Sequence, residues 1–498
     1  MTGVKQRAVK AIKAEFDGEF AATAQGGAVL AEKAMRSLGM RRLIGEHLPA
    51  RSSEAQYSTA DGAYALLAGL MVGGQGLGAA SSLGDDQLLK TMFGLERGVP
   101  SVPTMYRVLC DLAGLEERKE SETYVAAGRT LAAMDLFGHE RKVPKRRRVV
   151  PQEPESARAE NLAALEEYGA AVAKACVRAL PKEMLRLHGW YVLFGDATDL
   201  EVEGNCFDAA RMGRDGEKII RWQTVLLGPV CVAQQVNVGS EDEGRSMPRL
   251  LEVTRRRVRE MLGAWARMLL LMDAAYFERA VLDDLTWDFI VCANQQRAYL
   301  TRLAEQQPMW ADSGADDRRG WAESQVCCFS HRPEGWCNLV TIVARRWREN
   351  GELPGTWHYS FLATRLDSRD LPQNLLKKHG YCSLIWMLYG TKQGHEPYYK
   401  TFLRDFGLHH PPSCRLGINQ AFFTLAVAAA NVAMVLRYRV VDKEERGIEV
   451  WRLRQRYFQI AARVIQTGRT LTVYLSGVCV SALRQTLWRN AFAAAGQL

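Results

Sequence analysis

Apolar residues recur every three to four positions through much of the first 140 residues, which is the spacing of helices that bury one face. Within this region, Ser101 precedes one such segment and can cap a helix. Thr104 and Arg107 then lie one turn apart on one face, as in the second helix of a helix-turn-helix that enters a DNA major groove. An ordinary capped helix produces the same pattern, so both interpretations stay open.

From about residue 190 the apolar residues become continuous over short runs, which is typical of buried strands. We predict strands at 191–196, 219–227, 230–238, 268–273 and 289–293, with helices at about 247–266 and 277–285. The first and fourth of these strands each end in a carboxylate, Asp196 and Asp273. Ligands commonly bind at the carboxyl ends of strands in α/β sheets, so both side chains are candidates for a functional site.

Residues 300–375 are rich in tryptophan and contain five of the 12 in the chain. These are Trp310, Trp321, Trp336, Trp347 and Trp357. Short strands are predicted here at 326–329, 339–345 and 359–364. Residues 371–406 then have helical spacing and include Glu396. The longest apolar run, Ala421–Leu436, is shorter than the roughly 20 residues that span a bilayer, so we expect a buried helix and no membrane association.

Composition narrows the class of protein. A chain of 498 residues with 47% hydrophobic and 24% charged residues is not a disordered chain, a coiled coil or a collagen-like fibre. The net charge of +9 favours polyanionic partners. Six cations stand in the eight positions 141–148, next to Pro151, which indicates an exposed linker. Arg146, Arg147 and Arg148 either contact phosphates or are simply solvated.

The cysteines favour a reducing compartment. There are 11, with no CxxC pair, and the N-terminus lacks the apolar stretch of a secretory signal. We therefore expect reduced thiols and a cytoplasmic location. The densest cluster (Cys327, Cys328, His331 and Cys337) lacks the paired spacing of a structural zinc site.

Asp196 and Asp273 on two strands and Glu396 on a later helix form a candidate catalytic set. Three converging carboxylates repel one another unless a cation lies between them. Two Mg²⁺ ions, or Mn²⁺ as a substitute, can activate a nucleophilic oxygen and stabilise the leaving oxygen of a phosphodiester. The set therefore predicts metal-dependent phosphoryl transfer on nucleic acid. Asp199 is an alternative ligand, but residues i and i+3 of a strand face opposite sides, which favours Asp196.

The residues around these carboxylates resemble the DDE transposases of bacterial insertion sequences. They are Gly-Asp-Ala-Thr at 195–198, Asp-Ala-Ala-Tyr-Phe at 273–277 and Tyr-Gly-Thr-Lys-Gln-Gly-His-Glu at 389–396. More narrowly, they are similar to a clade with a Tyr-x2-Arg-x3-Glu-x6-Lys signature. Tyr389, Lys392 and Glu396 match its first three positions, with Lys in place of Arg.

The last basic position of that signature is displaced in this chain, because Leu403 stands where Lys is expected. Lys400 and Arg404 are the alternatives, and Lys400 is preferred because it lies one turn from Glu396 on the same helical face. The resemblance implies that Tyr389 and Lys392, with one of these two cations, contact the DNA phosphate. It also implies that an aromatic ring of the tryptophan-rich segment stacks on an extruded base. The alternative, that all five tryptophans pack in the core of the insertion itself, stays open.

The resemblance implies an α/β fold with an RNase H-like core, a mixed sheet flanked by helices, which is split by a β-rich insertion and preceded by a helical N-terminal domain. The implied divisions are a helical DNA-binding and dimerisation domain (1–140), a basic linker and helix (141–185), the first part of the core (186–299), the insertion (300–372), the second part with the Glu helix (373–440) and a basic tail (441–498).

By the same resemblance, the protein is expected to bind terminal inverted repeats of double-stranded DNA and to cut and join strands as a homodimer in the bacterial cytosol. Two alternatives stay open. One is an RNase H-like nuclease without strand transfer, and the other is a catalytically silent DNA-binding protein derived from a transposase.

Overall fold

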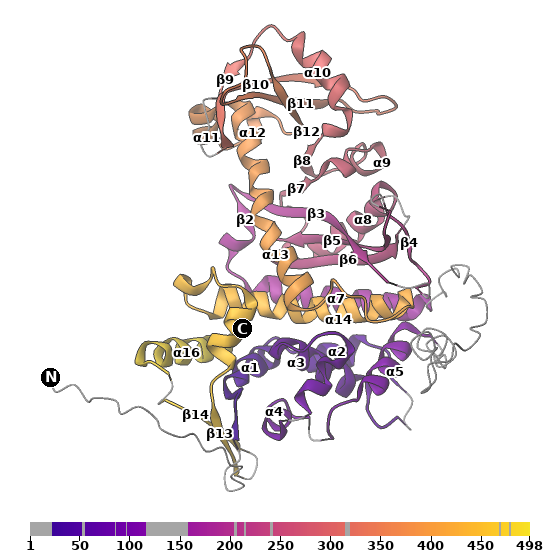
Figure 1. Cartoon of the computed structure of the whole chain (residues 1–498), viewed down its shortest axis with the longest axis vertical. Helices are drawn as coiled ribbons and strands as arrows, with labels where there is room; N and C mark the ends of the chain where they lie inside the picture. The colour runs from indigo at the N-terminus through magenta and orange to yellow at the C-terminus, as the bar shows by residue number, and fades with distance from the viewer. Residues whose placement is uncertain are drawn as a thin grey trace, which may run out of the picture.

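The computed structural model describes residues 22–51, 55–84, 86–95, 97–115, 158–203, 207–213, 216–239, 243–313, 319–467, 470–477 and 480–498. In this part of the chain, a long mixed sheet meets a layer of helices along one edge (Figure 1). The mixed α/β class that the sequence predicted is therefore confirmed.

Eleven strands of the described residues form this sheet. They are β2 (Arg186–Leu187), β3 (Trp190–Glu201), β4 (Arg211–Met212), β5 (Lys218–Leu227), β6 (Val230–Val238), β7 (Met268–Met272), β8 (Asp288–Cys292), β9 (Ala311–Asp312), β10 (Trp321–His331), β11 (Val340–Glu349) and β12 (His358–Thr364). Their main order is β4-β5-β3-β7-β8-β12-β11-β10-β9, with β6 beside β5 and β2 beside β3.

The centre of the sheet is parallel. β3 pairs with β7 and β7 pairs with β8 in parallel register, and every residue of β7 is buried. Strands covered on both faces need continuous apolar runs, which explains the pattern that predicted them. One expected boundary was wrong: β3 does not end at Asp196 but continues to Glu201, because its antiparallel partner β5 goes on pairing beyond the point where β7 stops.

Two expected helices also differ in extent. The basic helix predicted at 247–266 is α8 (Glu243–Leu262), which is followed by Gly263 with a left-handed φ of 89°. The helix predicted at 277–285 is reduced to a 3-10 turn at Ala274–Tyr276 and the four-residue helix α9 (Arg279–Leu282).

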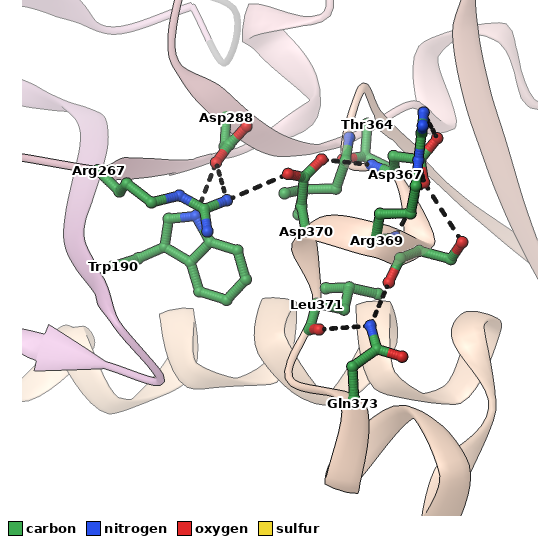
Figure 2. A network of polar contacts seen from close by, with 11 residues as sticks. Trp190, Arg267, Asp288, Thr364, Asp367, Arg369, Asp370, Leu371 and Gln373 are labelled. Atoms are coloured by element: carbon green, nitrogen blue, oxygen red, sulfur yellow. Dashed lines mark hydrogen bonds and ion pairs between the residues drawn. The ribbon is translucent and has the colours of Figure 1, made fainter.

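The strands of the predicted insertion extend the same sheet, because β12 pairs antiparallel with β8. A polar network at the start of the parallel strands fastens this extension (Figure 2). The Trp190 indole donates to Asp288 Oδ2 at 2.7 Å, and the guanidinium of Arg267 lies within 3.4 Å of Asp288 and 3.5 Å of Asp370. Asp370 lies in the turn that leads from β12 towards the helices of the site, so the network helps to hold those helices against the sheet.

The remaining elements are mostly helical. They are α1 (Val29–Ser37), α2 (Met40–His47), α3 (Thr59–Val72), α4 (Gln87–Met92), α5 (Val102–Ala113), α7 (Ala159–Ala179), α10 (Arg297–Glu305), α11 (Gln373–His379), α12 (Tyr381–Gly390), α13 (Glu396–Lys400), α14 (Leu416–Val435), α15 (Val450–Leu453) and α16 (Ala482–Ala495). A small separate sheet contains β1 (Ala22–Thr23), β13 (Ala462–Thr467) and β14 (Thr470–Leu475).

Helix α14 is the central element of the helical layer and lies between β6 and the N-terminal helices (Figure 1). Leu416–Val440 is long and apolar enough to cross a membrane, and its most apolar window is entirely buried inside the protein. The Asn431 side chain accepts from the Cys231 backbone N–H at 2.9 Å and donates to the Cys231 carbonyl at 3.0 Å. Gln420 accepts from the Val236 N–H at 2.7 Å. The helix thus satisfies buried backbone groups of β6, and the buried helix that the sequence predicted is confirmed.

Candidate active site

Asp196 and Asp273 lie side by side at the point where β7 ends. Gly195 pairs with Met272 in the parallel register, so the next residue of each chain segment is an aspartate. The ammonium of Lys392 lies 2.8 Å from Asp273 Oδ1 and 3.5 Å from Asp196 Oδ2. One cationic atom is therefore within reach of both carboxylates.

Burial sets the electrostatics of this cluster. It raises the pKa of Asp196, Asp273 adds to the rise, and Lys392 opposes it. Burial alone would lower the pKa of Lys392, but the attraction of Asp196 and Asp273 outweighs burial and raises it. The Lys392 side chain is only 15% exposed, whereas the Asp273 side chain is 53% exposed, so the carboxylate pair is still open to a ligand.

The cluster lies in the wall of a cavity of about 340 Å³. The cavity is lined by Phe194, Asp196, Asp273, Arg319, Arg345, Trp386, Tyr389, Gly390, Lys392, Gln393, His395, Glu396 and Tyr399. The Tyr389 hydroxyl lies 3.4 Å from Asp273 Oδ1 and 3.3 Å from the Met272 carbonyl, and it donates towards both acceptors. Residues of β3, α12 and α13 thus share one cavity with Asp273, which directly follows β7, although some are 200 residues apart in the sequence.

Glu396 lines the same cavity but does not join the aspartates directly. It is the first residue of α13, and a 3-10 segment, Thr391–His395, separates it from α12. Within the described residues, no group of three or more His, Cys, Asp or Glu side chains is arranged to hold a metal ion. The structure therefore brings two of the three predicted carboxylates together and places the third on the wall of the cavity.

Two neighbours of the predicted triad have structural partners. Asp199 forms a two-point ion pair with Arg221, from Oδ1 to Nε at 2.6 Å and from Oδ2 to Nη2 at 3.1 Å. His395 stacks on Phe194, and its Nδ1 lies 3.2 Å from the Thr391 carbonyl. Burial lowers the pKa of His395 to about 3, so the ring is neutral at pH 7 and has a packing role.

The other predicted DNA contacts lie away from the cavity. Lys400 and Arg404 both turn towards Glu449, at 3.7 Å and 4.0 Å. Thr104 lies in the first turn of α5, where its N–H approaches the Ser101 cap at 3.4 Å, and Arg107 is exposed on the same helix. The run that contains Arg146, Arg147 and Arg148 lies outside the described residues.

The tryptophans predicted to meet a base mostly pack against neighbours. Trp321 and Trp347 stack with centroids 5.0 Å apart, and Trp336 packs on Phe277 at 5.3 Å. Trp310 and Trp357 both pack against Arg346, with ring centroids 4.2 Å and 4.5 Å from its guanidinium carbon.

A different tryptophan, Trp386, lines the cavity, with Arg345 above its ring at 4.3 Å. Sequence reasoning missed Trp386, Arg345 and Arg319 as residues of the site. The spacing offered a signal for Trp386, because it lies three residues before Tyr389 and so shares a helical face with it. For the two arginines, which come from the predicted insertion, there was no local signal.

Helix α8 presents a second cationic surface. Arg245, Arg249, Arg256 and Arg259 are exposed and spaced so that they share one face of the helix. Glu252 lies in the same face, with Arg255 paired to it at 2.7 Å. Arg257 points inward instead and donates to the backbone carbonyls of Val232 and Glu166 at 2.7 Å and 2.6 Å. Arg257 therefore has a structural role inside the protein and is not part of the cationic surface.

A family model agrees with the sequence resemblance at the level of the family. No curated protein matches the chain. A cryo-EM structure of the piggyBac transposase synaptic complex with hairpin DNA is similar to it, with a TM-score of 0.40 and 9% sequence identity over 86% of this chain and 76% of that chain. Residues 234–494 match the family described as Transposase DDE domain group 1, a segment that begins after Asp196 and contains Asp273, Lys392 and Glu396. Because this match covers more than half of the chain, the protein belongs to that family and is a DDE transposase.

Proposed function

We propose that this transposase moves a bacterial insertion sequence by binding its terminal inverted repeats and by cutting and rejoining the DNA strands. Asp196, Asp273 and Glu396 are the proposed catalytic carboxylates, in an RNase H-like core that the β10–β12 strands interrupt. One observation carries the proposal: two aspartates on neighbouring parallel strands share one cation at the wall of a cavity that also contains Glu396.

The carboxylate pair fits a divalent cation. The ammonium of Lys392 already lies between the two carboxylates as a positively charged stand-in, and oxygen ligands are those that Mg²⁺ and Mn²⁺ prefer. Asp196 and Asp273 would hold the metal, with Glu396 as the third acidic residue. When bound, two such ions would activate the attacking oxygen and stabilise the leaving oxygen of the phosphodiester.

Groups of the chain itself would bind and orient the DNA. Arg319 and Arg345 on the cavity wall would attract the phosphate whose bond is cut. The Tyr389 hydroxyl would hold Asp273 in place. Trp386 offers an aromatic face for a displaced base, and stacking of this kind contributes about 1–3 kcal/mol per base.

The wider DNA contacts are proposed at the arginine face of α8, where exposed cations can neutralise backbone phosphates. Lys400 and Arg404, which share Glu449, stay candidates for the same role. Thr104, Arg107 and the 141–148 run are further candidates from the sequence. A homodimer in a synaptic complex and a cytosolic location belong to the same proposal.

Cleavage of inverted-repeat DNA tests this function. Repeats found in the DNA that flanks the gene would supply the substrate, and the purified protein with Mg²⁺ should nick it and join the freed 3′ end to a target. Asp196→Ala, Asp273→Ala and Glu396→Ala should each lower cleavage by more than a hundredfold, although each variant should still bind DNA. Glu201→Ala, an exposed carboxylate at the end of the same strand β3, is the matched control and should cleave normally.

The two alternatives give different results in that assay. Cleavage without joined products would indicate a nuclease that lacks strand transfer. Binding without cleavage by the unaltered protein would indicate a silent derivative of a transposase. Normal cleavage by any one of the three carboxylate variants would remove that residue from the catalytic set.

A further inference from the structure

We propose that Lys392 is an exchangeable cation that couples metal binding to DNA binding in this transposase. Its ammonium neutralises Asp196 and Asp273 while the site is empty, leaves when a divalent cation enters, and then becomes available to a DNA phosphate. The inference rests on the proposed function and adds a reason for the divalent cation and DNA to bind cooperatively.

The first step is that the ammonium and a metal ion compete. Lys392 Nζ lies 2.8 Å from Asp273 Oδ1 and 3.5 Å from Asp196 Oδ2, in the space where an ion shared by the two carboxylates would lie. Two cations at such short range repel strongly in a partly buried site. A metal ion bound by both aspartates therefore displaces the ammonium.

The second step is that the segment around Lys392 has room to move its ammonium away from the aspartates. It lies in the 3-10 segment Thr391–His395, and a 3-10 stretch inside a longer helix often marks a hinge. A Cβ added to Gly390 or Gly394 would meet no atom within 4 Å, so the backbone on both sides of Lys392 has open space around it. The same segment leads directly to Glu396, so a shift that removes the ammonium also changes the position of the third carboxylate.

The third step is the change in charge. Two carboxylates and one ammonium sum to −1, which opposes the approach of a phosphate to this part of the cavity. With one divalent cation added, the sum is +1, and the displaced ammonium lies beside the cavity that Arg319 and Arg345 also line. A phosphate then replaces the aspartates as the partner of Lys392. By thermodynamic reciprocity, DNA must tighten metal binding by the same factor by which metal tightens DNA binding.

Mn²⁺ titrations followed by electron paramagnetic resonance test the coupling, with and without a short duplex of arbitrary sequence. For the unaltered protein, we expect the duplex to lower the apparent Kd for Mn²⁺ about tenfold, within the usual range of coupling between sites. Lys392→Gln should bind Mn²⁺ about tenfold more tightly without DNA and should lose the effect of DNA. Lys392→Arg keeps the charge and should retain the coupling.

Lys378→Gln is the matched control, because it removes an exposed ammonium from α11 that does not line the cavity, and it should behave like the unaltered protein. Thermal unfolding gives a second readout: without metal, Lys392→Gln should melt at a lower temperature than the unaltered protein, and Mn²⁺ should raise its Tm by a larger amount. Equal or weaker Mn²⁺ binding by Lys392→Gln would overturn the coupling. If neither protein bound Mn²⁺, the metal-dependent function itself would be wrong, and this inference with it.

Discussion

Asp196 and Asp273 occupy adjacent positions on parallel strands, because Gly195 and Met272 pair immediately before them. Gly195 leaves room for the side chain of Met272, because an added Cβ would lie 3.0 Å from both Cγ and Sδ of Met272. The absence of a side chain at this glycine therefore lets Met272, the residue before Asp273, pack against β3 beside the two carboxylates.

Gly195→Ala should accordingly be mildly destabilising and should impair catalysis. Overpacking of a buried site costs about 1–3 kcal/mol, and the Met272 side chain would have to move, which would shift the neighbouring Asp273 relative to Asp196. Urea unfolding and the cleavage assay measure the two effects. Gly390→Ala is the control, because its Cβ would meet no atom within 4 Å, and its stability should be unchanged or slightly higher.

The neutral His395 predicts a loss of stability in acid. Burial lowers its pKa to about 3, against about 6.5 in the unfolded chain, so between these values the unfolded state binds a proton that the folded state does not. Stability therefore falls as the pH is lowered from about 6.5 towards about 3. His395→Gln should flatten this part of the Tm profile of the metal-free protein. An unchanged slope would show that other groups cause the acid dependence.

Arg454 is a buried cation whose removal should lower the stability of the protein. Its guanidinium donates to the carbonyls of Met71, Leu70 and Asp405 at 2.9 Å, 2.8 Å and 2.9 Å, which ties α3 to the helical segment that follows Glu396. Arg454→Met leaves these carbonyls without that donor and should cost about 3–5 kcal/mol. Urea unfolding measures the loss.

Arg456→Met is the matched control for that change. Arg456 lies two residues away, is exposed and pairs with Glu445 on the surface, so its removal should cost no more than about 1 kcal/mol. If the two variants were equally stable, the buried hydrogen bonds of Arg454 would have no net value.

The arginine face of α8 predicts a change in the salt dependence of DNA binding. Replacing Arg245, Arg249, Arg256 and Arg259 by Gln should lower the slope of log affinity against log salt by about 0.9 for each phosphate that the helix no longer neutralises. Fluorescence anisotropy at several salt concentrations measures the slope. The control replaces Arg297 and Arg302, two exposed arginines on α10, by Gln. If the slope changed equally in the α8 and α10 variants, the α8 face would not be a specific DNA contact.

The sequence by itself determined the class of the fold and the residue types of the site. Continuous apolar runs marked the central strands because a strand covered on both faces leaves no polar position for water. The residues around Asp273 and Glu396 were also enough to indicate the transposase family, since these short motifs are local in the chain.

Only the tertiary structure decided how these residues meet. The register of β3 on β7 made Asp196 the neighbour of Asp273, and the pairing with β5 carried β3 beyond the aspartate that was predicted to end it. The tertiary structure also places Lys392 beside the two carboxylates and Lys400 beside Glu449. Periodicity reports which residues are buried along one segment, whereas these contacts depend on the alignment of segments far apart in the chain, which local propensities do not encode.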